Sequence, residues 1–111
     1  MNQVDASEAI RVVNDRLRQT GVGGRQLITP GINEMGLIAV MRLRRLIADF
    51  DGFSEDNDPH KEHDFGSIGF QGQTVFWKID YYDRTLAAGS PEPSDPDVTT
   101  RVLTIMLAQE Y

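Results

Sequence analysis

The chain has 111 residues, 40% of them apolar and 25% charged, which is typical of one compact globular domain rather than two. It contains no cysteine, and this excludes a disulfide framework, a thiolate zinc site and a thiol nucleophile. The net charge is −6, and residues 49–97 alone hold twelve acids against three basic residues, an excess that disfavours direct binding to the nucleic-acid backbone.

Residues 5–19 have the pattern of an amphipathic helix. Asp5 followed by Glu8 fits a capping box at its start. Arg11 and Asp15 are spaced to pair on the outer side. The apolar residues fall on one stripe, which we expect to face the core: Ala6, Ala9, Ile10, Val13 and Leu17.

A short strand and a second helix follow. Residues 25–29 predict the strand, since glycine precedes it and a Pro-Gly pair ends it. Residues 32–50 predict the helix, with an apolar face at Met35, Ile38, Ala39, Leu43, Leu46, Ile47 and Phe50. The helix also carries three arginines, Arg42, Arg44 and Arg45. Arginines can recognise anionic groups, but more often their charged ends stay solvated while their aliphatic stems cover the edge of the core. We expect the solvated role here.

The clearest structural pattern is a β-hairpin over residues 64–82. A two-residue turn at Gln71 and Gly72 pairs residues 70 with 73, 68 with 75, 66 with 77 and 64 with 79. Alternation then predicts one core face, made of Ile68, Phe70, Val75, Trp77, Ile79 and Tyr81. Gly66 lies opposite Trp77 in this register and leaves room for the indole.

The other face of the hairpin is polar and aromatic, with Phe65, Ser67, Thr74, Phe76, Lys78, Asp80 and Tyr82. Extending the same pairing by one step places His63 opposite Asp80. The sequence therefore predicts a polar cluster of His63, Lys78, Asp80 and Tyr82 on one side of one sheet.

Residues 98–109 predict a last helix, with Asp95 to cap it and Pro96 in the first turn. It is apolar nearly all round, so we expect it to be central and buried. The element order α-β-α-β-β-α indicates an α+β fold. We expect a small antiparallel sheet of two to four strands, centred on the 64–82 hairpin and packed against helices, with residues 1–111 forming a single domain.

Residues 56–64 hold the carboxylates and imidazoles that suit a transition metal: Asp56, Asp58, His60, Glu62, His63 and Asp64. Their spacing does not match the helical His-Glu-x-x-His pattern. It also lacks the glycine turn of a calcium loop. We therefore expect no bound metal and no cofactor, and interpret these acids as a solvated loop.

Acid–base chemistry by His63, oriented by Asp80, is a second catalytic interpretation. A carboxylate partner fixes the tautomer of an imidazole and raises its basicity. No Gly-x-Ser-x-Gly elbow supplies a nucleophile beside it. A structural cross-strand pair, contributing ~0.2–1 kcal/mol, is the interpretation we favour.

The N-terminal residues lack the basic segment and long apolar run of a secretory signal. No apolar run approaches the roughly 20 residues that a membrane-spanning helix needs. We expect a cytoplasmic protein with no membrane contact.

Four segments carry a family resemblance: NDP at 57–59, EHDFG at 62–66, FWKIDYYD at 76–83 and TRVLTIMLAQEY at 100–111. With these motifs the chain resembles an uncharacterised bacterial family, catalogued as a domain of unknown function and found in genomes, plasmids and integrated elements. The resemblance covers most of the chain and implies no reaction. Occurrence on mobile elements implies a role in conflict between element and host, such as blocking a restriction or CRISPR system.

The function we expect is that of a small acidic, non-enzymatic interaction protein, an inhibitor of a bacterial defence system of the anti-restriction or anti-CRISPR type. Its expected partner is a protein with a basic surface that handles nucleic acid, and the expected contact residues are Asp51, Glu55, Asp56, Asp58, Glu62, Phe76, Lys78 and Tyr82. The alternative is a small hydrolase-like or metal-dependent enzyme centred on His63 and Asp80, with Lys78 and Tyr82 nearby. The sequence leaves the oligomeric state open.

Overall fold

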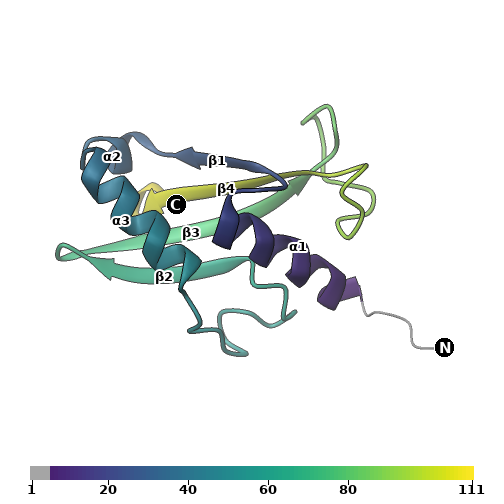
Figure 1. Ribbon diagram of the computed structural model, residues 1–111, viewed down its shortest axis with the longest axis horizontal. Helices are drawn as coiled ribbons and strands as arrows, with labels where there is room; N and C mark the ends of the chain where they lie inside the picture. The colour runs from purple at the N-terminus through teal and green to yellow at the C-terminus, as the bar shows by residue number, and fades with distance from the viewer. Residues whose placement is uncertain (1–5) are drawn as a thin grey trace.

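The computed structural model describes residues 6–111, which form a four-stranded mixed sheet with helices packed on one face (Figure 1). The helices are α1 (Ala6–Thr20), α2 (Pro30–Asn33), α3 (Leu37–Ala48) and the short 3-10 helix η1 (Ala108–Glu110). The strands are β1 (Arg25–Ile28), β2 (Phe65–Phe70), β3 (Gln73–Tyr82) and β4 (Thr100–Leu107), in the spatial order β1-β4-β3-β2. The α+β class is confirmed, but the sheet is not purely antiparallel, because the edge strand β1 runs parallel to β4.

The predicted hairpin is confirmed, register included. Phe70 pairs with Gln73 and Gly66 with Trp77, and the Ile79 amide donates to the Asp64 carbonyl at 2.8 Å. A Cβ on Gly66 would lie 2.3 Å from Trp77 Nε1, so the missing side chain does make room for the indole. The predicted core face is also confirmed: Val75, Trp77 and Ile79 are buried, while Ile68, Phe70 and Tyr81 pack against the same cluster.

The predicted C-terminal helix is wrong, and so is the element order built on it. Residues 100–107 form β4, the strand between β1 and β3, and only residues 108–110 turn into a helix. A central strand is buried on both faces, so residues 102–107 are apolar apart from Thr104 and have no period that distinguishes them from a buried helix. The strand's β-branched residues, Val102, Thr104 and Ile105 among them, agree with an extended conformation.

The predicted helix over residues 32–50 is two helices, because Gly36 has a positive φ of 93° and separates α2 from α3. Its predicted apolar face is partly wrong. Val40, Leu43 and Ile47 are buried with Ala39, whereas Ile38 and Leu46 are exposed. Met35 and Phe50 lie outside α3 but still pack on the core.

Helix α1 follows its predicted stripe only in part: Ile10 and Leu17 are buried, but Ala6 is exposed. Asn14 and Arg18, which lie outside the stripe, are buried as well. The predicted cap, Asp5, lies outside the described residues. The predicted Arg11–Asp15 pair does not form, since Asp15 instead contacts Arg18 and His63. None of the helices within residues 6–111 has the length and apolar character needed to cross a membrane.

Candidate functional site

The helices cover only one face of the sheet, and the other face carries four of the predicted site residues. Phe76, Lys78, Asp80 and Tyr82 alternate along β3 with the buried Val75, Trp77 and Ile79. The register of β4 and β1 brings further side chains to this face: Val102, Thr104 and Met106 from β4, with Arg25 and Leu27 from β1. We call the groove lined by Arg25, Leu27, Thr29, Lys78, Asp80, Tyr82, Leu86, Val102, Thr104, Met106, Glu110 and Tyr111 the sheet groove.

The sheet groove has a volume of about 590 Å³ and an apolar floor with a few charged groups. Val102 and Met106 form the floor, and Leu27 is half exposed beside them. Lys78 Nζ lies 3.0 Å from Asp80 Oδ2. The hydrogen bond to Asp80 raises the pKa of Lys78, so the ammonium stays charged within this ion pair.

The C-terminal turn closes one end of the groove. Glu110 Oε1 accepts hydrogen bonds from the Thr29 hydroxyl at 2.6 Å and the Leu107 amide at 2.9 Å, and Oε2 accepts from the Gly31 amide. The Thr29 hydroxyl is the main reason that the pKa of Glu110 is lowered. This anchored turn places Tyr111 beside Phe76, with ring centroids 5.8 Å apart. The hydrogen bonds of Glu110 therefore fix the position of Tyr111, which forms the aromatic wall of the groove together with Tyr82.

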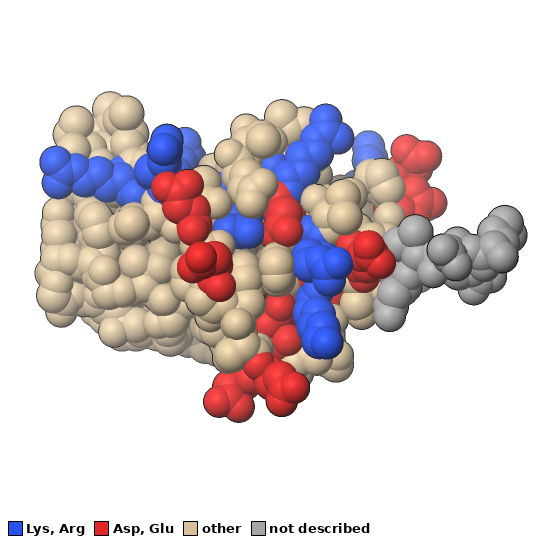
Figure 2. All heavy atoms as spheres, turned by 60° about the horizontal axis from the view of Figure 1, so that its bottom comes forward, with Lys and Arg blue, Asp and Glu red and all other residues tan. Residues whose placement is uncertain are grey.

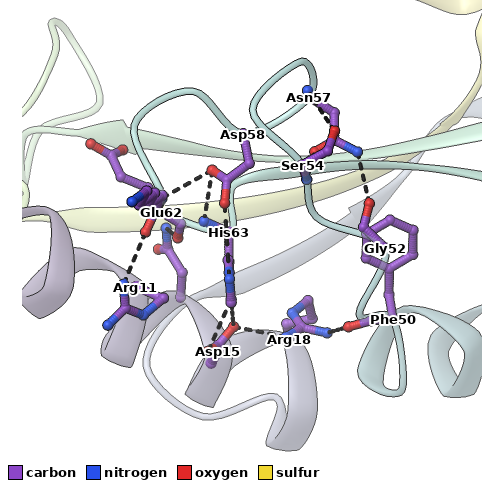
Figure 3. A network of polar contacts seen from close by, with 12 residues as sticks. Arg11, Asp15, Arg18, Phe50, Gly52, Ser54, Asn57, Asp58, Glu62 and His63 are labelled. Atoms are coloured by element: carbon purple, nitrogen blue, oxygen red, sulfur yellow. Dashed lines mark hydrogen bonds and ion pairs between the residues drawn. The ribbon is translucent and has the colours of Figure 1, made fainter.

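His63 is not on this face, and its predicted pairing with Asp80 is wrong. β2 begins only at Phe65, and His63 has a positive φ of 55°, which turns its side chain toward α1. His63 Nδ1 lies 2.9 Å from Asp15 Oδ1 (Figure 3). The imidazole stacks on the ring of Phe53, with 3.7 Å between the ring centroids. The pairing rule failed because it assumed an extended chain two residues beyond the end of the strand.

Asp58 organises the loop that carries His63. Its side chain is only 4% exposed, and Oδ1 accepts hydrogen bonds from the Glu62 and His63 amides at 3.0 and 3.2 Å (Figure 3). Oδ2 lies 3.9 Å from His63 Nε2, so the imidazole is flanked by carboxylates at both nitrogens. A hollow of about 310 Å³ opens beside it, lined by Arg11, Phe53, Ser54, Glu55, Asp58, Lys61 and His63.

The loop is joined to the sheet by a buried polar network that the sequence did not reveal. Asn14 donates to the Glu62 carbonyl at 3.0 Å and to the Tyr81 hydroxyl at 2.8 Å, while Tyr81 donates to Glu62 Oε1 at 2.9 Å. Burial raises the pKa of Tyr81, so its hydroxyl keeps its proton and remains a donor. Arg101 completes the network by donating from Nε to Asn14 Oδ1 at 2.8 Å.

A family model described as "Protein of unknown function (DUF3768)" matches residues 28–110. The chain belongs to the DUF3768 family. No curated protein and no solved structure matches it. The matched segment begins at the last residue of β1 and ends at η1, so it includes most of the sheet groove but leaves out Arg25, Leu27 and Tyr111. Helix α1, which supplies Asn14, Asp15 and Arg18 to the contacts with the loop, precedes it.

The expected contact residues of this DUF3768 chain separate into three groups. Asp51, Glu55 and Asp56 are exposed on the loop, whereas Asp58 and Glu62 are engaged inside it. Phe76, Lys78 and Tyr82 lie on the uncovered sheet face, with Lys78 and Tyr82 lining the groove. On the face shown in Figure 2, acidic and basic side chains are interspersed rather than gathered into one acidic patch.

The candidate metal ligands of the DUF3768 chain do not converge. Asp56 and His60 are exposed, while Asp58 is buried and bonded to backbone amides. Among residues 6–111, no three His, Asp or Glu side chains are grouped to hold a metal ion.

Several residues of the sheet groove were not identified as site residues from the sequence. Val102, Thr104 and Met106 were assigned to a helix, and Arg25 and Leu27 to an edge strand with no role. Their alternation along β1 and β4 is the signal that a strand assignment would have given.

Proposed function

We propose that the protein is a non-enzymatic binding protein that holds a segment of a protein partner in the sheet groove. The observation that carries the proposal is the groove itself, with its apolar floor, aromatic wall and a few placed charges. Binding sites commonly have this composition and a volume of roughly 300–1,000 Å³. Tyr82, Tyr111 and Leu27 are anchors of the kind that supply much of the energy in protein interfaces.

The exposed acids of the loop indicate what kind of partner the protein would bind. Asp51, Glu55 and Asp56 are exposed, and the segment 49–97 carries a strong acidic excess, which supports a partner with a basic surface. We propose a nucleic-acid-handling protein of a bacterial defence system as that partner, with this chain as its inhibitor. The basic partner rests on charge, and the defence role rests on the family resemblance described above.

Substitutions in the groove should weaken partner binding without unfolding the chain. We expect Leu27→Glu and Tyr82→Ala each to weaken binding by roughly thirtyfold, because each removes an apolar anchor from the groove. Titration of a partner recovered by pull-down measures this. Val22→Glu changes an equally exposed apolar residue outside the groove and is the control. Equal binding by all three variants would exclude the groove.

Reversing the exposed loop acids should slow association rather than disrupt the fold. We expect the triple variant Asp51→Lys, Glu55→Lys and Asp56→Lys to lower the association rate, and added salt to do the same in the unmodified chain, because exposed charges steer encounter. Stopped-flow kinetics across a salt series measures both effects. An association rate indifferent to salt and to charge reversal would show that the acids serve only solubility.

Asp58, another of the expected contact residues, is left out of this charge-reversal variant. Its carboxylate is buried and accepts two backbone amides, so reversing it leaves those amides without their acceptor and places an ammonium beside His63.

The Asp15–His63 contact favours one second candidate function, a small hydrolase-like enzyme. Asp15 fixes the tautomer of His63, and Arg11 and Lys61 line the hollow beside the imidazole. Asp15 replaces the predicted Asp80 as orienting carboxylate in this alternative. Ser54 lines the same hollow, but within residues 6–111 its hydroxyl is recorded accepting from the Asn57 amide and makes no hydrogen bond to His63.

We expect no tightly bound transition metal in protein purified without added metal. The metal-ligating side chains of the 56–64 run point to different partners, and such a site needs several ligands around one position. Elemental analysis of the purified chain is the measurement. One equivalent of Zn, Mn or Fe, lost in His63→Ala, would instead promote the enzyme alternative.

A further inference from the structure

The outward side of α3 is apolar where a surface helix usually presents polar residues. Leu37, Ile38 and Met41 are 74%, 64% and 58% exposed, although the opposite side of the helix already buries Val40, Leu43 and Ile47. Residues three and four apart are neighbours on a helix, so Leu37 and Ile38 both lie beside Met41 and the three exposed side chains form one patch. Such exposed apolar patches mark sites of interaction more often than solitary apolar residues do.

Arginines continue this patch along the helix. Arg42, Arg44 and Arg45 are all exposed, and the α3 sequence, LIAVMRLRRLIA, contains no acid. Arg45 pairs with Asp49 at 2.9 Å on the solvent side, while Arg42 and Arg44 have no ion pair within residues 6–111. We call Leu37, Ile38, Met41, Arg42, Arg44 and Arg45 the outer α3 surface. It combines exposed apolar area with positive charge that the chain itself does not match.

We propose that the outer α3 surface docks an acidic, amphipathic segment of a second protein. Arginine and methionine are enriched in protein interfaces, and an acidic partner supplies the charge that Arg42 and Arg44 lack. A second copy of this chain fits poorly, because facing α3 helices would bring their arginines together. Nucleic acid would leave Leu37, Ile38 and Met41 without apolar contacts. An anionic membrane is an extended surface that would meet the net charge of the whole chain, −6, whereas a single bound segment meets only the outer α3 surface.

This surface is independent of the proposed function. α3 packs on the face of the sheet that the groove does not use, so both surfaces are accessible at once (Figure 1). The chain is then able to bind two proteins on opposite sides.

The test titrates isotope-labelled full-length chain with a synthetic helical peptide. The peptide has leucines at i, i+3, i+4 and i+7 with glutamates beside them, and a second peptide has lysines in place of the glutamates. We expect the acidic peptide alone to shift the amide resonances of α3. Met41→Glu and the double variant Arg42→Glu, Arg44→Glu should each weaken its binding by at least about tenfold. All changed side chains are exposed, so thermal unfolding should be nearly unchanged.

Matched controls lie on α1. Val12→Glu and Arg16→Glu change an exposed apolar residue and an exposed arginine away from α3, and both should bind the acidic peptide as the unmodified chain does. No saturable binding, equal binding of the lysine peptide, or equal loss in the α1 variants would overturn the proposal. So would binding to phosphatidylserine vesicles in place of the acidic peptide, or a dimer by sedimentation that Met41→Glu dissolves.

Discussion

Trp77→Ala will lower the free energy of unfolding by about 3–5 kcal/mol, because it empties the largest fully buried site in the described core. The indole lies between Gly66 on β2 and Ile105 on β4. The rings of Phe50 and Phe53 pack edge-on against the indole, with their centroids 5.6 and 6.1 Å from its centroid. Alanine leaves a cavity that these rigid neighbours fill only in part, and a loss of this size is comparable to the whole stability of many small domains.

Urea unfolding monitored by circular dichroism measures this loss, and the neighbouring strand position supplies the control. Phe76→Ala removes an aromatic ring from the same strand but from the half-exposed uncovered face, so we expect a clearly smaller loss. Gly66→Ala tests the same contact from the other side, since its Cβ would meet the indole. A loss below about 1 kcal/mol in Trp77→Ala would mean that the core lies on the other face of β3.

The hairpin was predictable because every signal for it is local. Residues 71 and 72 form the turn, with positive φ at both Gln71 and Gly72, and strict alternation on each side fixes the register. The pairing of Gly66 with Trp77 supports that register, because the missing side chain of Gly66 leaves room for the indole. Each of these signals involves residues close in sequence, and none depends on the rest of the fold.

The C-terminal strand was not predictable by the same reasoning. Residues 102–107 are mostly apolar on both sides because β4 is covered by the helices on one face and contributes buried side chains to the groove on the other. Hydrophobic periodicity indicates which sides of an element are buried, but it does not distinguish a strand that is buried on both faces from a buried helix. A helix assignment here removes the floor of the sheet groove, so the groove could not be predicted from the sequence.

The polar site was predicted in composition but not in partners. His63, Asp58 and Glu62 were identified as a group, yet the side chains of His63 and Glu62 are bonded to Asp15 and Tyr81, which no spacing rule connects with them. Asp15 and Asn14 come from α1, 48 residues before His63 and Glu62. The positive φ values of Lys61 and His63 reverse the loop locally, and an extended-strand rule has no means of anticipating that.

Asn14→Ala will also lower the free energy of unfolding by about 3–5 kcal/mol, because Asn14 is the centre of the buried polar network. Its amide donates to the Glu62 carbonyl and the Tyr81 hydroxyl, and its oxygen accepts from Arg101 Nε at 2.8 Å. Arg101 is 2% exposed, and burial lowers its pKa because desolvation disfavours the charged form. Alanine removes the acceptor of Arg101 Nε while leaving the buried charge in place.

Urea unfolding again supplies the measurement, and two further variants separate the causes. Asn57→Ala removes hydrogen bonds to Gly52 and Ser54 in an exposed part of the loop, and we expect a cost of only about 1 kcal/mol. Asn14→Asp keeps the acceptor for Arg101 but loses both donated bonds, so it should fall between Asn14→Ala and the unmodified chain. If Asn14→Ala costs no more than Asn57→Ala, then Arg101 is satisfied by its bond to the Pro93 carbonyl and by the Tyr81 ring 5.1 Å from Cζ. The link between α1 and the His63 loop would then be a matter of packing, and the 58–63 loop should keep its amide exchange protection in the variant.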